Sequence, residues 1–142
     1  MKILIVEDNA LVAMDLEQQL LFAGHEVIGI AATVAEAIEV ARNTDGDLAL
    51  MDVSLADGSS GVDAARLLKN RYNIPSVYIT ADLPGSPEVR LYGIGHLSKP
   101  FDEGELLRSV SFIRSMMRGD TDQTQPSRLR LFPEQVINAE MA

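Results

Sequence analysis

The stretch Ile3-Leu4-Ile5-Val6-Glu7-Asp8 sets four apolar residues directly before two carboxylates. A short, uninterrupted run of leucine and β-branched side chains is typical of a strand that is buried on both faces of a sheet. The run is too short for the apolar region of a signal peptide, which takes at least about seven residues. We therefore predict a central strand with an acidic pair at its carboxyl end.

Short apolar runs alternate with helical patterns along most of the chain. Thr33 with Glu36, and Asp102 with Glu105, have the spacing of capping boxes that begin helices. Strand–helix repeats continue to about residue 118, which favours a parallel sheet with helices on both faces. The predicted fold class is α/β, a three-layer (βα)5 sandwich. Its expected strands are residues 3–6, 27–30, 48–51, 74–79 and 95–98.

The composition is that of a single globular domain. Of the 142 residues, 46% are hydrophobic and 23% are charged. No apolar run approaches the roughly 20 residues that span a bilayer, so no membrane contact is expected. The net charge of -9 makes nucleic acid an unfavourable direct partner. The lack of cysteine excludes disulfides and thiolate metal sites, and it fits the cytoplasmic location that we expect.

The pattern changes after Arg118. Residues 119–127 are polar and aperiodic, and they are predicted to form a linker. The remainder carries scattered apolar side chains with room for one short helix after Pro133, but it is too short for an independent domain. We therefore divide the chain into a domain over residues 1–118 and a polar linker with a short tail over residues 119–142.

Polar side chains stand where the predicted strands end. Glu7 and Asp8 follow the first strand, Asp52 the third, Thr80 the fourth and Lys99 the fifth. In an open α/β sheet the carboxyl ends of the strands line the ligand crevice. Two carboxylates about 4 Å apart repel by roughly 4 kcal/mol at an effective dielectric constant near 20, and a divalent cation would offset this repulsion. Mg²⁺ is the natural candidate because it shares its coordination between carboxylates, water and phosphate. With an ammonium and a hydroxyl beside them, these groups predict phosphoryl transfer to a carboxylate.

The sequence resembles the receiver domains of two-component response regulators over about residues 1–118. Four features, each behind a predicted strand, carry the resemblance. They are Ile5-Val6-Glu7-Asp8-Asn9, then Leu50-Met51-Asp52-Val53 with the loop Leu55-Ala56-Asp57-Gly58-Ser59-Ser60-Gly61, then Ile79-Thr80-Ala81, and last Leu97-Ser98-Lys99-Pro100-Phe101. The resemblance implies a flavodoxin-like sheet of order 2-1-3-4-5, in which the first and third strands are neighbours. That order comes from the family and not from the spacing.

The resemblance also implies a role for each polar residue. Asp52 would accept a phosphoryl group from the phosphohistidine of a histidine kinase or a histidine phosphotransferase. The chain would then catalyse transfer only to its own aspartate and would not be an enzyme for a separate substrate. Lys99 and Thr80 would contact the phosphoryl oxygens, and Thr80 would act as a switch residue. The Lys99–Pro100 peptide bond would be cis.

A Mg²⁺ site is implied by the same resemblance. Asp8 and Asp52 would bind the ion directly, and Glu7 would bind it through water. Ser54 would add its backbone carbonyl oxygen as a further ligand.

The sequence departs from the family pattern at two places. His96 stands three residues before the lysine, at the switch position that usually holds Tyr or Phe. The segment between Thr80 and Lys99 is shorter than usual and rich in proline, so the fourth helix is expected to be short, about residues 88–92. This departure puts in question the family's dimer surface, which combines the fourth helix, the fifth strand and the fifth helix.

The sequence disfavours functions from two other classes. A phosphatase of the haloacid-dehalogenase type needs a second acid two residues after its aspartate, and Ser54 stands there instead. A nucleotide-binding domain would have a glycine-rich loop after the first strand, where this chain has none. A receiver that binds partners without phosphorylation would be favoured only if a pocket residue were missing. We expect a stand-alone regulator, and the sequence leaves open whether it signals to a downstream protein or serves as a phosphate relay or sink.

Overall fold

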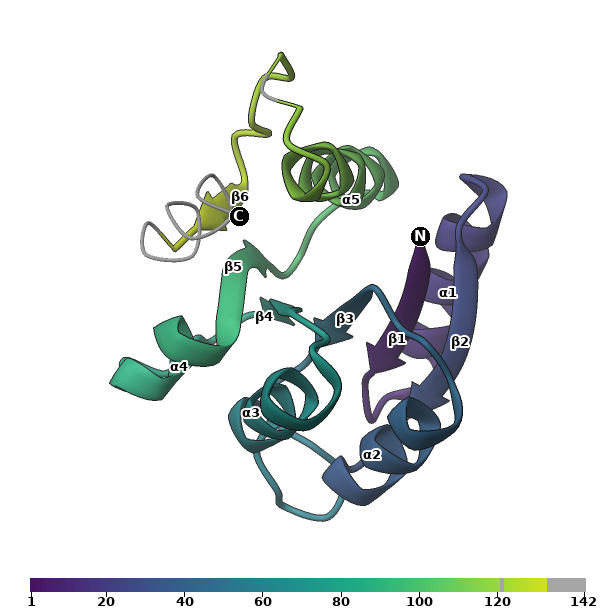
Figure 1. Ribbon diagram of the computed structural model, residues 1–142, viewed down its shortest axis with the longest axis vertical. Coiled ribbons are helices and arrows are strands. Elements are labelled where there is room, and N and C mark those ends of the chain that lie inside the picture. The colour runs from purple at the N-terminus through teal and green to yellow at the C-terminus, as the bar shows by residue number, and fades with distance from the viewer. Residues whose placement is uncertain (121, 133–142) are drawn as a thin grey trace.

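One six-stranded sheet lies at the centre of the computed structural model, which describes residues 1–120 and 122–132. The strands are β1 (Lys2–Val6), β2 (Glu26–Ala31), β3 (Leu48–Met51), β4 (Ser76–Thr80), β5 (Gly93–Ser98) and β6 (Leu129–Leu131). Within the same residues the helices are α1 (Ala10–Phe22), α2 (Val34–Asn43), α3 (Gly61–Tyr72), α4 (Pro87–Tyr92) and α5 (Glu103–Met117) (Figure 1).

The sheet has the strand order β2-β1-β3-β4-β5-β6, and its first five strands are parallel. This confirms the flavodoxin-like order 2-1-3-4-5. β1 and β3 lie next to each other with Val6 beside Met51, so the loops that follow these strands leave the sheet side by side. The topology therefore brings the acidic ends of two sequence-distant strands together.

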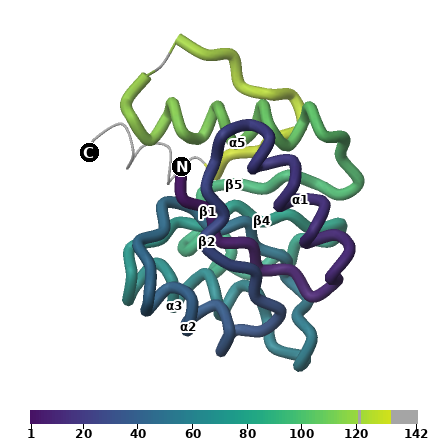
Figure 2. The backbone as a smooth tube through the Cα atoms, turned by 90° about the vertical axis from the view of Figure 1, so that its right-hand side faces the viewer, coloured from purple at the N-terminus to yellow at the C-terminus, as the bar shows by residue number. Residues whose placement is uncertain are grey.

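The helices cover both faces of the sheet, as the three-layer prediction requires. α1 and α5 pack on one face, where Leu16, Leu20 and Ile113 join Ile3 and Ile5 of β1 in a buried cluster. The second buried cluster combines side chains of α2, α3 and α4 with the residues of β1 that point the other way. Figure 2 shows α1 and α5 on one side of the strands and α2 and α3 on the other. Because β1 and β3 are buried on both faces, their polar neighbours at the strand ends are held on a rigid support.

The helix starts follow the predicted capping residues. At α5 the Asp102 carboxylate accepts from the Glu105 amide, and the Glu105 carboxylate accepts from the Asp102 amide, so this capping box is confirmed. At α2 the Thr33 hydroxyl accepts from the Glu36 amide at 3.1 Å. The return bond differs from the prediction, because the Glu36 carboxylate accepts from the amide of Ala32 and not from that of Thr33.

β6 is a strand that the sequence analysis assigned to the tail. It pairs antiparallel with β5, with Leu129 beside Leu97 and Arg130 beside His96. Leu129 of this strand is part of the core, since it is only 1% exposed. The boundary at residue 118 stays a prediction, but the sheet extends beyond it. The short helix expected after Pro133 lies outside the described residues.

The fourth helix is as short as the sequence predicted. α4 contains only the six residues Pro87–Tyr92, with proline in its first turn, where a missing amide costs no hydrogen bond. Within the described part of the chain, no helix combines the length and the apolar character needed to cross a membrane.

Candidate functional site

Three carboxylates meet at the carboxyl edge of the sheet. Glu7 and Asp8 follow β1, and Asp52 follows β3. The amide of Asp52 donates to the carbonyl of Val6 at 2.9 Å. One oxygen from each carboxylate lies within 4.8 Å of the others. Glu7 and Asp52 are buried, whereas Asp8 is exposed at the mouth of the cluster. The structure thus brings together the acidic residues that the sequence placed on separate strands.

Lys99 neutralises part of this charge. Its Nζ lies 3.2 Å from both carboxylate oxygens of Glu7 and 3.4 Å from Oδ2 of Asp52. The Lys99 side chain is 25% exposed, compared with 2% for Glu7 and 12% for Asp52, so the contact is largely shielded from water. The Lys99–Pro100 peptide bond is cis, as the family resemblance implied.

The pKa values of Glu7 and Asp52 move in opposite directions. Burial, together with a hydrogen bond to Asp52, raises the pKa of Glu7 from 4.5 to about 7. Burial alone would also raise the pKa of Asp52, but the hydrogen bond with Glu7, the charge of Lys99 and the amide of Val53 together lower it. Without a bound metal ion, Glu7 therefore holds a proton below about pH 7, where Asp52 is already ionised.

The Asp52 carboxylate has one restrained oxygen and one oxygen beside the lysine. Oδ1 accepts from the amide of Val53 at 2.7 Å, and Oδ2 faces Lys99. Gly61, the first residue of α3, packs against the backbone of Asp52. A Cβ at this position would lie 1.8 Å from the Asp52 carbonyl oxygen. Gly61 lies within the loop motif that carries the family resemblance, but no role for it follows from the sequence. The signal in the sequence is a glycine at the first position of a predicted helix, where no turn requires one. Such a glycine indicates a close approach of another backbone segment.

Thr80 and His96 lie together at the ends of β4 and β5. Nε2 of His96 lies 3.1 Å from the carbonyl oxygen of Thr80, so the ring bonds the backbone of the threonine and not its hydroxyl. The Thr80 hydroxyl lies 3.4 Å from the amide nitrogen and 3.5 Å from the carbonyl oxygen of Asp82, at the limit of hydrogen bonding. Both predicted switch residues are buried next to each other, and the hydroxyl is only loosely held.

The donor set of the cluster fits Mg²⁺. The donors are carboxylate oxygens on adjacent strand ends, which a hard divalent cation prefers, and one of them is open to solvent for the waters that Mg²⁺ retains. Ser54, the fourth predicted ligand, lies in the loop after β3, where it forms an isolated antiparallel bridge with Ser60. Coordination of Mg²⁺ by the backbone carbonyl oxygen of Ser54 stays a prediction.

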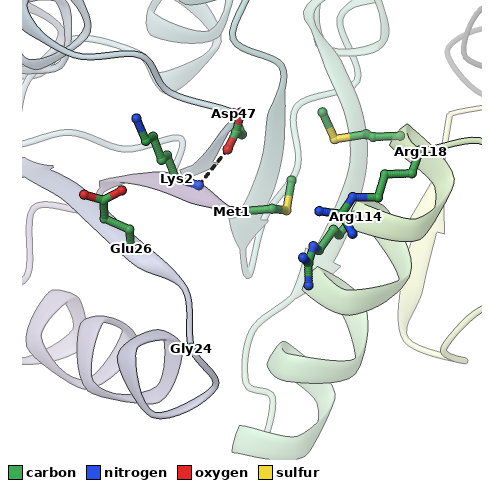
Figure 3. A pocket seen from close by; sticks show the side chains of 8 residues that line it. Met1, Lys2, Gly24, Glu26, Asp47, Arg114 and Arg118 are labelled. Carbon is green, nitrogen blue, oxygen red and sulfur yellow. Dashed lines mark hydrogen bonds between the residues drawn. The ribbon is translucent and has the colours of Figure 1, made fainter.

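A separate pocket lies at the other end of the parallel strands (Figure 3). It has a volume of about 460 Å³, and Lys2, Asp47, Arg114 and Arg118 are among its lining residues. The Lys2 amide donates to Asp47 at 2.7 Å within it. No predicted site residue lines this pocket, and its wall carries charges of both signs.

Comparison with known proteins gives a family match and two informative relatives. Residues 3–111 match the family described as the response regulator receiver domain. The phyllosphere-induced regulator PhyR of Methylorubrum extorquens is 47% identical over 81 residues, which cover 56% of this chain and 30% of PhyR. The transcriptional regulatory protein PdtaR of Mycobacterium tuberculosis is 33% identical over 120 residues, which cover 82% of this chain and 58% of PdtaR. The chain thus spans less than two thirds of the length of either relative.

Solved structures agree with this match. The REC domain of the Erythrobacter litoralis PhyR response regulator superposes with a TM-score of 0.67 at 35% identity, covering 78% of this chain and 87% of that domain. The N-terminal domain of a three-domain response regulator from Carboxydothermus hydrogenoformans superposes with a TM-score of 0.75 at 31% identity, covering 84% and 98%. Both similarities extend over nearly the whole of the compared domains.

Proposed function

The chain belongs to the response regulator receiver domain family, and on that basis we propose that it accepts a phosphoryl group on Asp52 from a histidine kinase or phosphotransferase. The observation that carries the proposal is the convergence of Asp52, Glu7, Asp8 and Lys99 from three different strand ends. Structural stability alone does not explain three carboxylates within 4.8 Å of one another, because their repulsion costs free energy.

In the proposed reaction, a carboxylate oxygen of Asp52 forms a bond to phosphorus. The bond from phosphorus to the histidine nitrogen of the donor breaks, and its electron pair leaves with that nitrogen. Asp52 is suited to this step because its lowered pKa keeps it ionised at neutral pH. The Lys99 ammonium, 3.4 Å from Oδ2, supports the negative charge of the phosphoryl oxygens as they arrive.

Four residues would hold Mg²⁺ in this pocket: Asp8 and Asp52 directly, Glu7 through water, and Ser54 by its backbone carbonyl oxygen. The ion supplies charge neutralisation to the phosphoryl oxygens. Glu7 would give up its proton when a cation is held there, since a nearby positive charge favours the ionised form of a carboxyl. Thr80 would then turn its loosely held hydroxyl toward the phosphoryl group, and His96 would respond through the Thr80 carbonyl that it contacts.

The surface beside the pocket supports a protein partner. α1 begins directly after the acidic pair and carries four large apolar side chains at positions that recur with helical spacing. Leu11 is 77% exposed and Phe22 is 86% exposed, with Met14 and Leu21 between them. Contiguous exposed apolar surface is a mark of a protein interaction site. We assign this stripe to the kinase or phosphotransferase, and the β4–α4 segment to the phosphorylation-dependent output.

Incubation with acetyl phosphate and Mg²⁺ tests the proposal directly. The intact protein should gain the mass of one phosphoryl group, and peptide mapping should place it on Asp52. The Asp52→Asn variant should gain nothing, whereas Asp57→Asn, an exposed aspartate of the following loop, should react like the wild type. Equal modification of the wild type and Asp52→Asn would refute the assignment and would favour a receiver that acts without phosphorylation.

A further inference from the structure

β5 has the composition of an edge strand that needs a cover. Its sequence, Gly93-Ile94-Gly95-His96-Leu97-Ser98, contains no proline and no fixed charge. Natural sheets usually protect their edge strands with proline or charged residues, because an open strand pairs with other chains. At Gly95 a Cβ would lie 2.7 Å from the carbonyl oxygen of Arg130, so the glycine allows the neighbouring backbone to approach closely. The edge of β5 is therefore adapted to receive another strand.

β6 and the residue after it fill this edge and contribute side chains to both core clusters. Leu129 packs with Leu97 and the inner side chains of α5. Phe132, 6% exposed, joins the opposite cluster, and its amide donates to the carbonyl of Ile94 at 3.0 Å. Ahead of the strand, the Arg128 guanidinium donates to the carbonyl of Pro100 at 2.9 Å and lies 3.4 Å from the Glu105 carboxylate. The segment seated on this edge thus has the pattern Arg-Leu-x-x-Phe.

The same segment touches the groups next to the candidate switch. The ring of Phe132 lies 6.3 Å from that of Tyr78, which is two residues before Thr80 on β4. The Arg90 guanidinium of α4 lies 5.9 Å from the centre of the Phe132 ring. On the neighbouring strand, His96 pairs with Arg130 of β6 and contacts the Thr80 carbonyl. Thr80 is therefore connected to residues 129–132 by two chains of contacts, one through β4 and one through β5.

We propose that the edge of β5 is a docking site for an extended polypeptide with the pattern Arg-Leu-x-x-Phe, which β6 occupies until phosphorylation displaces it. The displacement rests on the proposed function of Asp52. β6 is suited to leave, because it has only three residues and follows a linker whose described residues are mostly exposed. While it is bound, a tethered strand competes at an effective concentration in the millimolar range, which keeps weaker outside segments away.

The full-length chain tests this proposal with beryllofluoride and Mg²⁺ in place of the phosphoryl group. The probe is a fluorescent peptide with the sequence of residues 125–132. We expect its affinity to rise at least tenfold on addition of beryllofluoride, and exchange of the Leu129 and Phe132 amides with deuterium to accelerate by a similar factor. A matched peptide with aspartate at both of those positions should not bind.

A locked variant provides the control. Because the chain has no cysteine, Leu97→Cys with Leu129→Cys gives one possible disulfide between neighbouring positions of β5 and β6. In the oxidised form, peptide binding should be lost while beryllofluoride still binds, and reduction should restore the wild-type response.

The possible outcomes separate this proposal from the function on which it rests. Fluorine NMR reports whether beryllofluoride binds in the pocket. If it binds there while amide exchange and peptide affinity stay unchanged, the docking site is refuted and the proposed function stands. If it does not bind, the proposed function is refuted, and phosphorylation can no longer be the cause of the displacement of β6. Self-association without peptide binding would replace the proposed partner with a second copy of the chain.

Discussion

Nζ of Lys99 lies 3.2 Å from both carboxylate oxygens of Glu7, a residue 92 positions away in the sequence. The lysine side chain reaches across the ends of the strands from β5 to β1. It also contacts Asp52, which follows β3, a strand that lies between β1 and β5 in the sheet. It is the cation that holds the acidic cluster together when no metal ion is bound. Its removal should therefore affect both stability and chemistry.

Lys99→Met should slow phosphorylation by acetyl phosphate roughly a hundredfold, because a preorganised charge near the transferred oxygens is lost. The free energy of unfolding should also fall by about 2 kcal/mol, the usual cost of losing hydrogen bonds to charged groups. Mass spectrometry over time gives the first quantity, and urea unfolding without Mg²⁺ gives the second. Lys2→Met, which makes the same change in net charge at an exposed position, should leave both near their wild-type values. A rate equal to that of the wild type would contradict the role of Lys99.

Glu7 should make the metal-free protein less stable as the pH rises from 4.5 to 7. In this window the folded chain keeps a proton on Glu7 that the unfolded chain has lost, because the pKa of Glu7 is raised to about 7 in the fold. The free energy of unfolding should fall by up to about 3 kcal/mol across the window. The lowered pKa of Asp52 acts below its usual value of 3.8, outside this range.

Urea unfolding in EDTA at several pH values checks this dependence. Glu7→Gln, which cannot ionise, should flatten the curve between pH 4.5 and 7 and should be more stable than the wild type at pH 8. An unchanged slope in the variant would show that another group causes the pH dependence.

Mg²⁺ should stabilise the folded chain by relieving the repulsion between the carboxylates. At a hundredfold excess over its dissociation constant the gain is about 2.7 kcal/mol. Asp52→Asn should weaken this response. The variant should also be more stable than the wild type without metal, since one of the repelling charges is gone. Thermal unfolding with Mg²⁺, and with sodium chloride at equal ionic strength, separates ion binding from screening. A melting temperature that millimolar Mg²⁺ leaves unchanged would refute the assembled metal site.

Most of the fold could be predicted from the sequence because local patterns are strong there. The apolar run before Glu7 and the capping residue Asp102 each identify an element without tertiary information. The strand order was taken from the family resemblance, since spacing alone does not set it. The co-location of Glu7, Asp8, Asp52 and Lys99 then follows from parallel strands that share one carboxyl edge.

Tertiary contacts determine what the sequence analysis missed. β6 has only three residues, and its alternation of Leu129, Arg130 and Leu131 is too short to separate from an irregular tail. Its position depends on the open edge of β5, which no local pattern reveals. The contact of His96 with the Thr80 backbone likewise depends on strand register. The orientation of the Thr80 hydroxyl toward Asp82 is set by the loop that follows β4.

Gly61 is the position where a single methyl group should do most harm to the site. A Cβ there would lie 1.8 Å from the carbonyl oxygen of Asp52 and 2.8 Å from its carbonyl carbon. Backbone atoms cannot turn aside as a side chain can, so either α3 or the Asp52 loop must shift. The Gly61 amide also donates to the Val53 carbonyl at 2.7 Å, which ties the helix start to the residue after the aspartate.

Gly61→Ala should therefore lower the free energy of unfolding by about 2 kcal/mol, as overpacking commonly does. The rate of phosphorylation should fall at least tenfold as well, because a displacement of about 1 Å at a reacting group can cost a hundredfold. The matched control is Gly85→Ala, where a Cβ meets no atom within 4 Å. Stability by urea unfolding and rate by mass spectrometry are measured on both variants below the onset of unfolding. If Gly61→Ala is destabilised but reacts at the wild-type rate, the glycine supports the fold and does not position Asp52.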